Sequence, residues 1–147
     1  MAKISIKVKV RDNKLFEVRE TFLRFKGGKA GFFDGQSYPN GLTVAANAAI
    51  HNFGTKHIPA RPFMDEAAQA FEAAESQVAT IYRKAIESSD ASIANQRVGA
   101  LYAQKIRESI RKGNFAALDK KTIERKGSSK PLIDTGLLIG SVSFKEN

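Results

Sequence analysis

The sequence predicts an α+β fold, in which a small, mainly antiparallel sheet packs against two long antiparallel helices and several short ones. Residues 3–10 alternate apolar and polar side chains, which is typical of a strand with one buried face. Residues 62–89 and 90–113 carry apolar side chains three or four positions apart, which is typical of amphipathic helices. The chain has 147 residues, no internal repeat and no low-complexity linker, so we expect a single domain over residues 1–147.

The segment after the first strand predicts a short helix and a short strand. Residues 13–25 place apolar side chains at helical spacing, which favours a helix over a second strand. The sequence "AGFFDG", residues 30–35, predicts a strand. Neighbouring side chains of a strand point to opposite faces, so Phe32 and Phe33 cannot both enter the same core. One of the two is expected to cover an edge or to meet a partner.

Residues 42–53 predict an alanine-rich helix. Thr43 is its candidate N-cap, because a threonine hydroxyl accepts backbone N–H groups of a first turn. Gly54 is placed to end the helix in a left-handed conformation. The alanines project little side chain, so another element can approach this helix closely.

The two long helices are expected to form an antiparallel hairpin. Pro62 suits the start of the first, because its missing N–H is not needed there. Asp90 or Ser92 caps the second, and Gly113 ends it. A short polar turn at residues 88–91 joins them, which predicts the hairpin.

The C-terminal part predicts a short helical turn, a Gly-Ser-Ser-Lys-Pro loop, a brief helix and a closing strand. Asp134 or Thr135 opens the brief helix. The closing strand is "GSVSFK", residues 140–145, in which Val142 and Phe144 share one face.

The net charge of +9 is unevenly distributed. Residues 1–33 hold nine basic side chains against three acidic ones, and residues 91–112 hold five against one. Residues 63–90, by contrast, hold six acidic side chains against two basic ones. Such a surplus is compatible with nucleic acid or with acidic protein partners. No Arg–aromatic interleaving and no known nucleic-acid-binding motif is present, so the charge alone does not decide between them.

The composition excludes several classes of protein. The chain has no Cys, hence no disulfide, no thiolate nucleophile and no Cys-based metal site. No apolar run approaches the roughly 20 residues needed to cross a bilayer. The N-terminal "MAKISIKVKV" interleaves charges with apolar residues, unlike a signal peptide. We therefore expect a soluble protein made in the cytoplasm, with no membrane partner.

No catalytic or metal site is predicted. His51 and His57 are the only histidines, and the predicted end of a helix lies between them, which fits no zinc-ligand spacing. The chain has neither a G-x-S-x-G nucleophile elbow nor a G-x-x-x-x-G-K-[ST] phosphate loop. The residues of a Ser–His–Asp site are brought together by the fold of a protein and not by their spacing in the sequence. A hydrolase that uses one of these histidines is therefore kept as a third hypothesis. Our prediction is a protein that is not an enzyme and holds no cofactor or metal.

The linker "IHNFGTKHIPARPFM", residues 50–64, which we call the elbow, is stiffened by two prolines. Each proline fixes its own φ and pushes the preceding residue towards an extended backbone. Two interpretations stay open. In one, Phe53 and Phe63 belong to the core and Arg61 forms a surface ion pair. In the other, the elbow is an assembly surface that presents Arg61 to a neighbouring subunit.

Three stretches of the sequence resemble one family. Residues 44–64, "VAANAAIHNFGTKHIPARPFM", resemble A-x-x-x-E/N-F-G-T … I-P-x-R-P-F, with Asn52 where an acidic residue is commoner. Residues 121–144, "KTIERKGSSKPLIDTGLLIGSVSF", resemble T-I-x-x-K-G … K-P-L-I-D-T-G-x-L-x-x-S-I. Residues 31–45, "GFFDGQSYPNGLTVA", resemble the strand and loop before the first motif. The family is the tail-completion, or head–tail joining, family of long-tailed bacteriophages and prophages, which includes tail terminator and neck proteins.

The resemblance implies a structural virion protein with an α+β fold and no enzymatic activity. Relatives form a ring, usually hexameric, at the head-proximal end of the tail, where it ends tail growth and docks to the head connector. Double-stranded DNA passes through the ring. The implied partners are copies of the chain, the tail tube protein and connector or adaptor proteins. The implied location is the neck of the virion tail, after synthesis in the bacterial host cytoplasm. The alternative is a basic nucleic-acid-binding protein.

The resemblance also implies where subunits meet. A closed ring needs two different complementary patches on each subunit, and the acidic and basic segments have opposite signs. The lysines on the outer face of the first strand either line the lumen or, as we favour, meet an acidic partner; they are Lys3, Lys7 and Lys9. The residues expected at the assembly interface are Phe33, Tyr38, His51, Phe53, Gly54, Arg61, Pro62, Phe63, Asp134 and Thr135.

Overall fold

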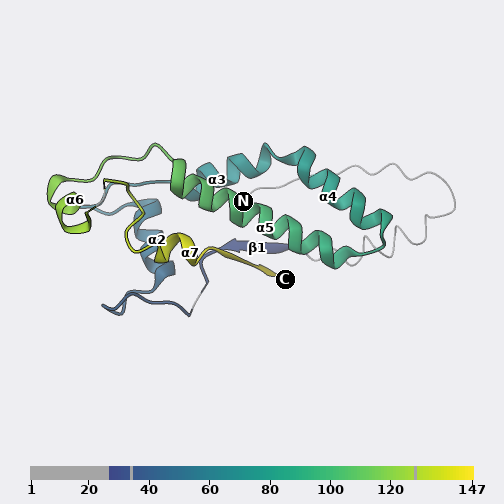
Figure 1. Cartoon of the computed structure of the whole chain (residues 1–147), viewed down its shortest axis with the longest axis horizontal. Coiled ribbons are helices and arrows are strands. Elements are labelled where there is room, and N and C mark those ends of the chain that lie inside the picture. Colours follow the sequence, from purple (N-terminus) through teal and green to yellow (C-terminus); the bar gives the residue numbers. More distant parts are fainter. Residues whose placement is uncertain (1–26, 34, 128) are drawn as a thin grey trace.

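The computed structural model describes residues 27–33, 35–127 and 129–147. This part of the chain is mostly helical, with a small two-stranded antiparallel sheet packed against a long helix (Figure 1). The predicted α+β character is confirmed at that level. The predicted strand over residues 3–10 and the predicted helix over residues 13–25 lie outside the described residues.

The sheet consists of β1, Gly28–Gly31, and β2, Ser143–Glu146, with Ala30 opposite Phe144. β2 begins later than the predicted closing strand, because Leu137–Gly140 forms the short helix α7. Both strands pack on one helix, α5, whose Gly99 permits the close approach. A Cβ at Gly99 would overlap the Phe144 ring.

The two adjacent phenylalanines after β1 have different environments. Phe32 packs edge-on against Phe63, with 6.0 Å between the ring centroids, and joins the edge of the core. Phe33 lies under the ammonium group of Lys145, which is 4.6 Å from the ring centroid. The predicted strand over residues 30–35 is misplaced, because β1 ends at Gly31 and both phenylalanines follow it. As predicted, only one of them, Phe32, joins the core.

Helix α2, Val44–Phe53, has the predicted N-cap. The hydroxyl oxygen of Thr43 accepts the backbone N–H of Ala46 at 3.2 Å. Gly54 follows the helix with a φ of 74°, as predicted, but its ψ of 178° is extended rather than left-handed helical. The reason is that the chain turns sharply after Gly54, where the Thr55 N–H donates to the Ile58 carbonyl at 2.8 Å.

The first long helix is bent, and our prediction of one continuous helix over residues 62–89 is wrong. It is divided into α3, Phe63–Glu72, and α4, Glu75–Glu87. At the junction the Ala74 N–H donates to the Phe71 carbonyl at 3.0 Å, which tightens one turn. No Pro or Gly occurs between Phe63 and Glu87, so the bend follows from packing: both helices lie along α5.

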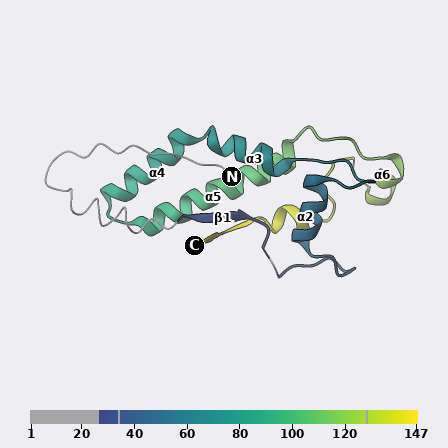
Figure 2. The same ribbon diagram turned by 180° about the vertical axis from the view of Figure 1, so that it is seen from behind.

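Helix α5, Ala91–Lys112, is the central element of the described fold. Figure 1 shows it between the α3–α4 pair on one side and the sheet on the other, and Figure 2 shows the same order from behind. A carboxylate oxygen of Asp90 accepts the N–H groups of Ser92 and Ile93, so Asp90 rather than Ser92 is the N-cap. The short connection from α4 confirms the predicted hairpin.

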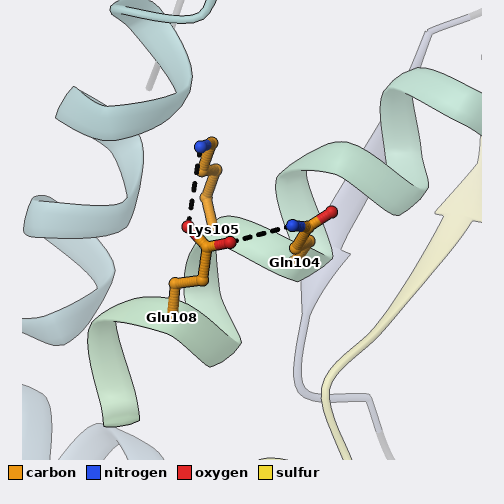
Figure 3. Close-up of polar contacts among 3 residues, drawn as sticks. All are labelled: Gln104, Lys105 and Glu108. Carbon is orange, nitrogen blue, oxygen red and sulfur yellow. Dashed lines mark hydrogen bonds and ion pairs between the residues drawn. The ribbon is translucent and has the colours of Figure 1, made fainter. Parts of the chain in front are cut away.

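The outer face of α5 carries a small polar cluster. Glu108 accepts a hydrogen bond from Gln104 at 2.8 Å and lies 3.5 Å from the ammonium nitrogen of Lys105 (Figure 3). The Gln104 hydrogen bond is the main reason that the pKa of Glu108 is lowered. Pairs at this spacing contribute about 0.2–0.5 kcal/mol to a helix, so the cluster supports α5 locally.

Two short helices bring the C-terminal part back to the core. Asp119 caps α6, Lys120–Lys126, by accepting the Thr122 N–H at 2.7 Å. At α7, the hydroxyl oxygen of Thr135 accepts the Leu137 N–H at 3.3 Å, so Thr135 rather than Asp134 contacts the first turn. α7 packs on α2. The buried core cluster therefore joins both halves of the chain; it consists of Val44, Ala48, Phe63, Ala67, Ala103, Ile106, Ile110, Leu132, Leu138 and Val142.

Candidate functional site

The elbow does not present Arg61 to solvent. Only 3% of Arg61 is exposed, and its Nε donates to the Ala116 carbonyl at 3.3 Å. Its backbone N–H donates to the His51 carbonyl at 2.8 Å, which ties the elbow to α2. Both of our interpretations of Arg61, a surface ion pair and an outward contact, are wrong, because the elbow folds the side chain beneath the segment that follows α5.

His51 lies beside this buried guanidinium. The Nδ1 atom of His51 is 3.5 Å from Nη1 of Arg61. Burial lowers the pKa of His51, and the nearby charges of Arg61 and Lys126 lower it further. His51 is therefore neutral at pH 7, which is the form that can accept a hydrogen bond at a ring nitrogen.

A cavity of about 490 Å³ opens between α2, α6 and α7, and we call it the α2–α6 cavity. Four residues predicted at the assembly interface line it: Tyr38, His51, Asp134 and Thr135. The hydroxyl oxygen of Tyr38 accepts a hydrogen bond from the Asn47 amide at 3.0 Å, which holds the loop before α2 against the helix. The fold thus brings together residues that lie far apart in the sequence.

The α6 wall of this cavity is basic. Arg125 and Lys126 line it, and the ammonium group of Lys126 donates to the Lys130 carbonyl at 3.2 Å. Burial lowers the pKa of Lys126; Asp134 opposes this shift, whereas the charges of Arg61 and Arg125 add to it. Lys126 therefore lies near one carboxylate, that of Asp134, and near two further cations, Arg61 and Arg125.

Phe33 and Phe53 line a second hollow, of about 400 Å³, between β1 and α2. We call it the apolar groove. Ala45 and Ala49 form part of its wall, and their small side chains leave it open. Phe53 is 78% exposed, so the interpretation that placed it in the core is wrong.

The other predicted interface residues are dispersed. Phe63 is fully buried in the core, as one interpretation held, which corrects its assignment to the assembly interface. Pro62 is exposed, and Gly54 is half-buried at the base of the elbow. The three lysines that were predicted to line the lumen or to meet an acidic partner lie outside the described residues; they are Lys3, Lys7 and Lys9.

Sequence analysis missed several residues of the site. Arg125 and Lys126 belong to the C-terminal block that carries the family resemblance, and its run of basic residues was the available signal. Asn52 was also missed: it is 5% exposed, and its side-chain oxygen accepts the Met64 N–H at 3.0 Å. Asn52 thereby caps α3, which Pro62 cannot do. No local sequence pattern predicts a cap that comes from another helix.

Compared with known proteins, the chain matches no family model, no curated protein and no solved structure. No helix within the described part of the chain is long and apolar enough to cross a membrane. Over residues 27–33, 35–127 and 129–147, no three His, Asp or Glu side chains are grouped so as to hold a metal ion. His57 is exposed in the elbow and does not line the α2–α6 cavity with His51.

We expect His51 to make the stability of the protein depend on pH. Its pKa is below 6.5 in the folded chain, whereas an unfolded histidine titrates near 6.5. Below pH 6.5 the unfolded chain takes up a proton that the folded chain resists, so the free energy of unfolding falls, by at most about 1.4 kcal/mol per pH unit for one proton. Urea unfolding between pH 7.5 and 5 should show a smaller loss for His51→Gln than for the wild type. His57→Gln, which changes an exposed histidine, should behave like the wild type; equal losses in all three proteins would contradict the prediction.

Proposed function

We propose that this chain is a tail-completion protein of a long-tailed bacteriophage or prophage. In this role it forms a ring, usually of six copies, that ends the tail tube and joins it to the head connector. Double-stranded DNA passes through the ring, and the chain makes and breaks no covalent bond. The kinked α3–α4 pair and α5 would be the two long helices of the family fold.

One observation carries the proposal: the two sequence blocks that resemble the family pack against each other. Val44 and Phe63 of the first block share the core cluster with Leu138 and Val142 of the second. His51 of the first block and Asp134 of the second line the same cavity. Motifs that form one structural unit are what a shared family fold requires, and this packing supports the resemblance.

The apolar groove supports an assembly role. A ring needs a heterologous contact, in which one patch of a subunit meets a different patch of the next. Phe53 exposes a large aromatic ring at the end of a rigid helix, beside Phe33 and two small alanines. Aromatic side chains in such positions are frequent anchors of protein interfaces.

We expect Phe53→Ala to leave the subunit folded but to block joining. Because the side chain is 78% exposed, its loss should change the free energy of unfolding by no more than about 0.5 kcal/mol. Head–tail joining should fall by at least about tenfold, since an anchor residue is removed at every subunit contact. The assay mixes purified protein with separated heads and tails and counts infectious particles. Ile93→Ala removes another exposed apolar side chain, 41% exposed, on α5, and serves as the matched control.

The proposal itself is tested with particles made with and without this chain. Without it, negative-stain images should show separate heads and tails of uneven length, and with it the chain should be found in purified virions. Intact particles without the chain would contradict the proposal. A salt titration of duplex DNA binding distinguishes the proposed function from its alternative. Tight binding with a steep salt dependence would indicate a nucleic-acid-binding protein instead.

A further inference from the structure

We propose that the α2–α6 cavity receives a carboxylate from a second copy of this chain, supplied by Glu72 or Glu75 at the bend between α3 and α4. This inference rests on the proposed ring and assigns one of its subunit contacts. Arg125 and Lys126 receive the carboxylate, and Arg61 lies next to the cavity wall, because its Nη1 is 3.5 Å from Nδ1 of the lining residue His51. The contact is heterologous, because the cavity and the bend are different parts of the subunit.

Arg61 is the first reason for this proposal. A buried arginine is normally paired with a carboxylate, because removing its charge from water costs several kcal/mol otherwise. Arg61 is 3% exposed, yet its side-chain contacts are the Ala116 carbonyl and the neutral His51 ring. Among the described residues, no carboxylate lies within ion-pair distance of its guanidinium. The positive charge is therefore only partly compensated by the described part of the subunit.

The crowding of like charges is the second reason. Burial lowers the pKa of Lys126 most, and the charges of Arg61 and Arg125 lower it further, so both cations lie near Lys126. Among the residues that the structure describes, Asp134 is the only carboxylate lining the cavity. A second carboxylate would balance the remaining excess of positive charge, and Arg125 is exposed and placed to meet it first.

The cavity has the size and polarity for a single acidic side chain. Its volume of about 490 Å³ lies between three helices and is partly open to solvent. Leu118, Leu132 and Leu138 line part of it and can contact the aliphatic stem of a glutamate, while Thr122 adds a hydroxyl group. A phosphate backbone is bound along a continuous basic groove, whereas Arg125 and Lys126 both come from the single short helix α6, so the cavity favours a protein carboxylate over DNA.

The bend between α3 and α4 supplies the complementary group. Glu72 and Glu75 flank the tightened turn and are exposed, whereas Phe71 and Ala74 beside them are buried against α5. The two glutamates therefore point away from the subunit. Neither has an ion-pair partner within the described part of the chain. In Figure 1 the bend lies on the outer side of the α3–α4 pair, away from α6, so the two patches cannot meet within one subunit.

Charge reversal tests the contact. The double variants Glu72→Lys/Glu75→Lys and Arg125→Glu/Lys126→Glu should each weaken self-association at least about tenfold, measured by sedimentation at low salt. An equimolar mixture of the two should assemble again, because in an alternating assembly each reversed bend meets a reversed cavity and each native bend meets a native cavity, so every contact joins opposite charges. Glu87→Lys, at the far end of α4, is the control and should assemble like the wild type.

Cross-linking supplies a second measurement that does not depend on the strength of assembly. The chain has no Cys, so single cysteines give a clean background. Arg125→Cys mixed with Glu75→Cys should form a dimer with a short bismaleimide, whereas Arg125→Cys mixed with Glu87→Cys should not. All three replaced side chains are exposed, so each variant is expected to fold.

The outcomes separate this inference from the proposed function. Reversed variants that assemble normally, a mixture that fails to recover, a wild-type chain that stays monomeric, or a missing cross-link would each overturn the inference. So would a reversal at the cavity that weakens duplex DNA binding and leaves self-association unchanged. A chain that assembles through this charge pattern but is absent from virions would contradict only the proposed function.

Discussion

Phe63→Ala is expected to lower the free energy of unfolding by about 3–5 kcal/mol, which is the usual cost of removing a buried aromatic ring. Phe63 has no exposed surface, and it is the first residue of α3, where it packs against Phe32 at 6.0 Å between ring centroids. Single domains are stable by only about 5–15 kcal/mol, so this variant should lose a large part of its total stability.

Urea denaturation followed by circular dichroism measures the effect. Phe53→Ala is the matched control, because it removes the same ring from a position that is 78% exposed. A loss below about 1 kcal/mol for Phe63→Ala would mean that the ring is not a central part of the core.

Gly54→Ala is expected to have the second-largest effect on stability, a loss of about 1–3 kcal/mol from backbone strain together with a steric overlap. The φ of 74° with a ψ of 178° lies in a region that essentially only glycine occupies. A Cβ would also lie 2.7 Å from the Ala60 nitrogen and 2.8 Å from the Ile58 oxygen. Both contacts are with backbone atoms, so the elbow would have to open.

Gly41→Ala separates the two causes. Gly41 also has a positive φ, of 82°, but no atom lies within 4 Å of the position that a Cβ would take. Gly41→Ala should lose stability from strain alone. Its loss of stability, measured by thermal unfolding, should therefore be smaller than that of Gly54→Ala. Equal losses would show that the overlap with the elbow is relieved without cost.

Local signals predicted the helix ends well. Thr43, Asp90 and Gly54 were identified because capping depends on residues within one turn of the helix end. The apolar stripes also identified the faces that α3, α4 and α5 bury, since helical periodicity is a property of the sequence itself.

Long-range packing decided the features that sequence analysis missed. The bend at Ala74 contains no Pro or Gly, and it arises because α3 and α4 follow the surface of α5. The cap of α3 comes from Asn52, in another helix, so its spacing carries no regular pattern. The two phenylalanines of the elbow have the same residue type and opposite environments, which composition cannot distinguish.

By itself, the sequence determined a Cys-free, basic, α+β chain with two amphipathic helical stretches, and the resemblance of its two blocks to phage tail-completion proteins. Only the tertiary structure decided that Arg61 is buried, that Phe53 is exposed, and that His51 and α6 share a cavity. The physical reason is that periodicity and capping act over a few residues. The exposure of a side chain depends instead on which distant segments cover it, and the segment after α5 covers Arg61 while nothing in the described part of the chain covers Phe53.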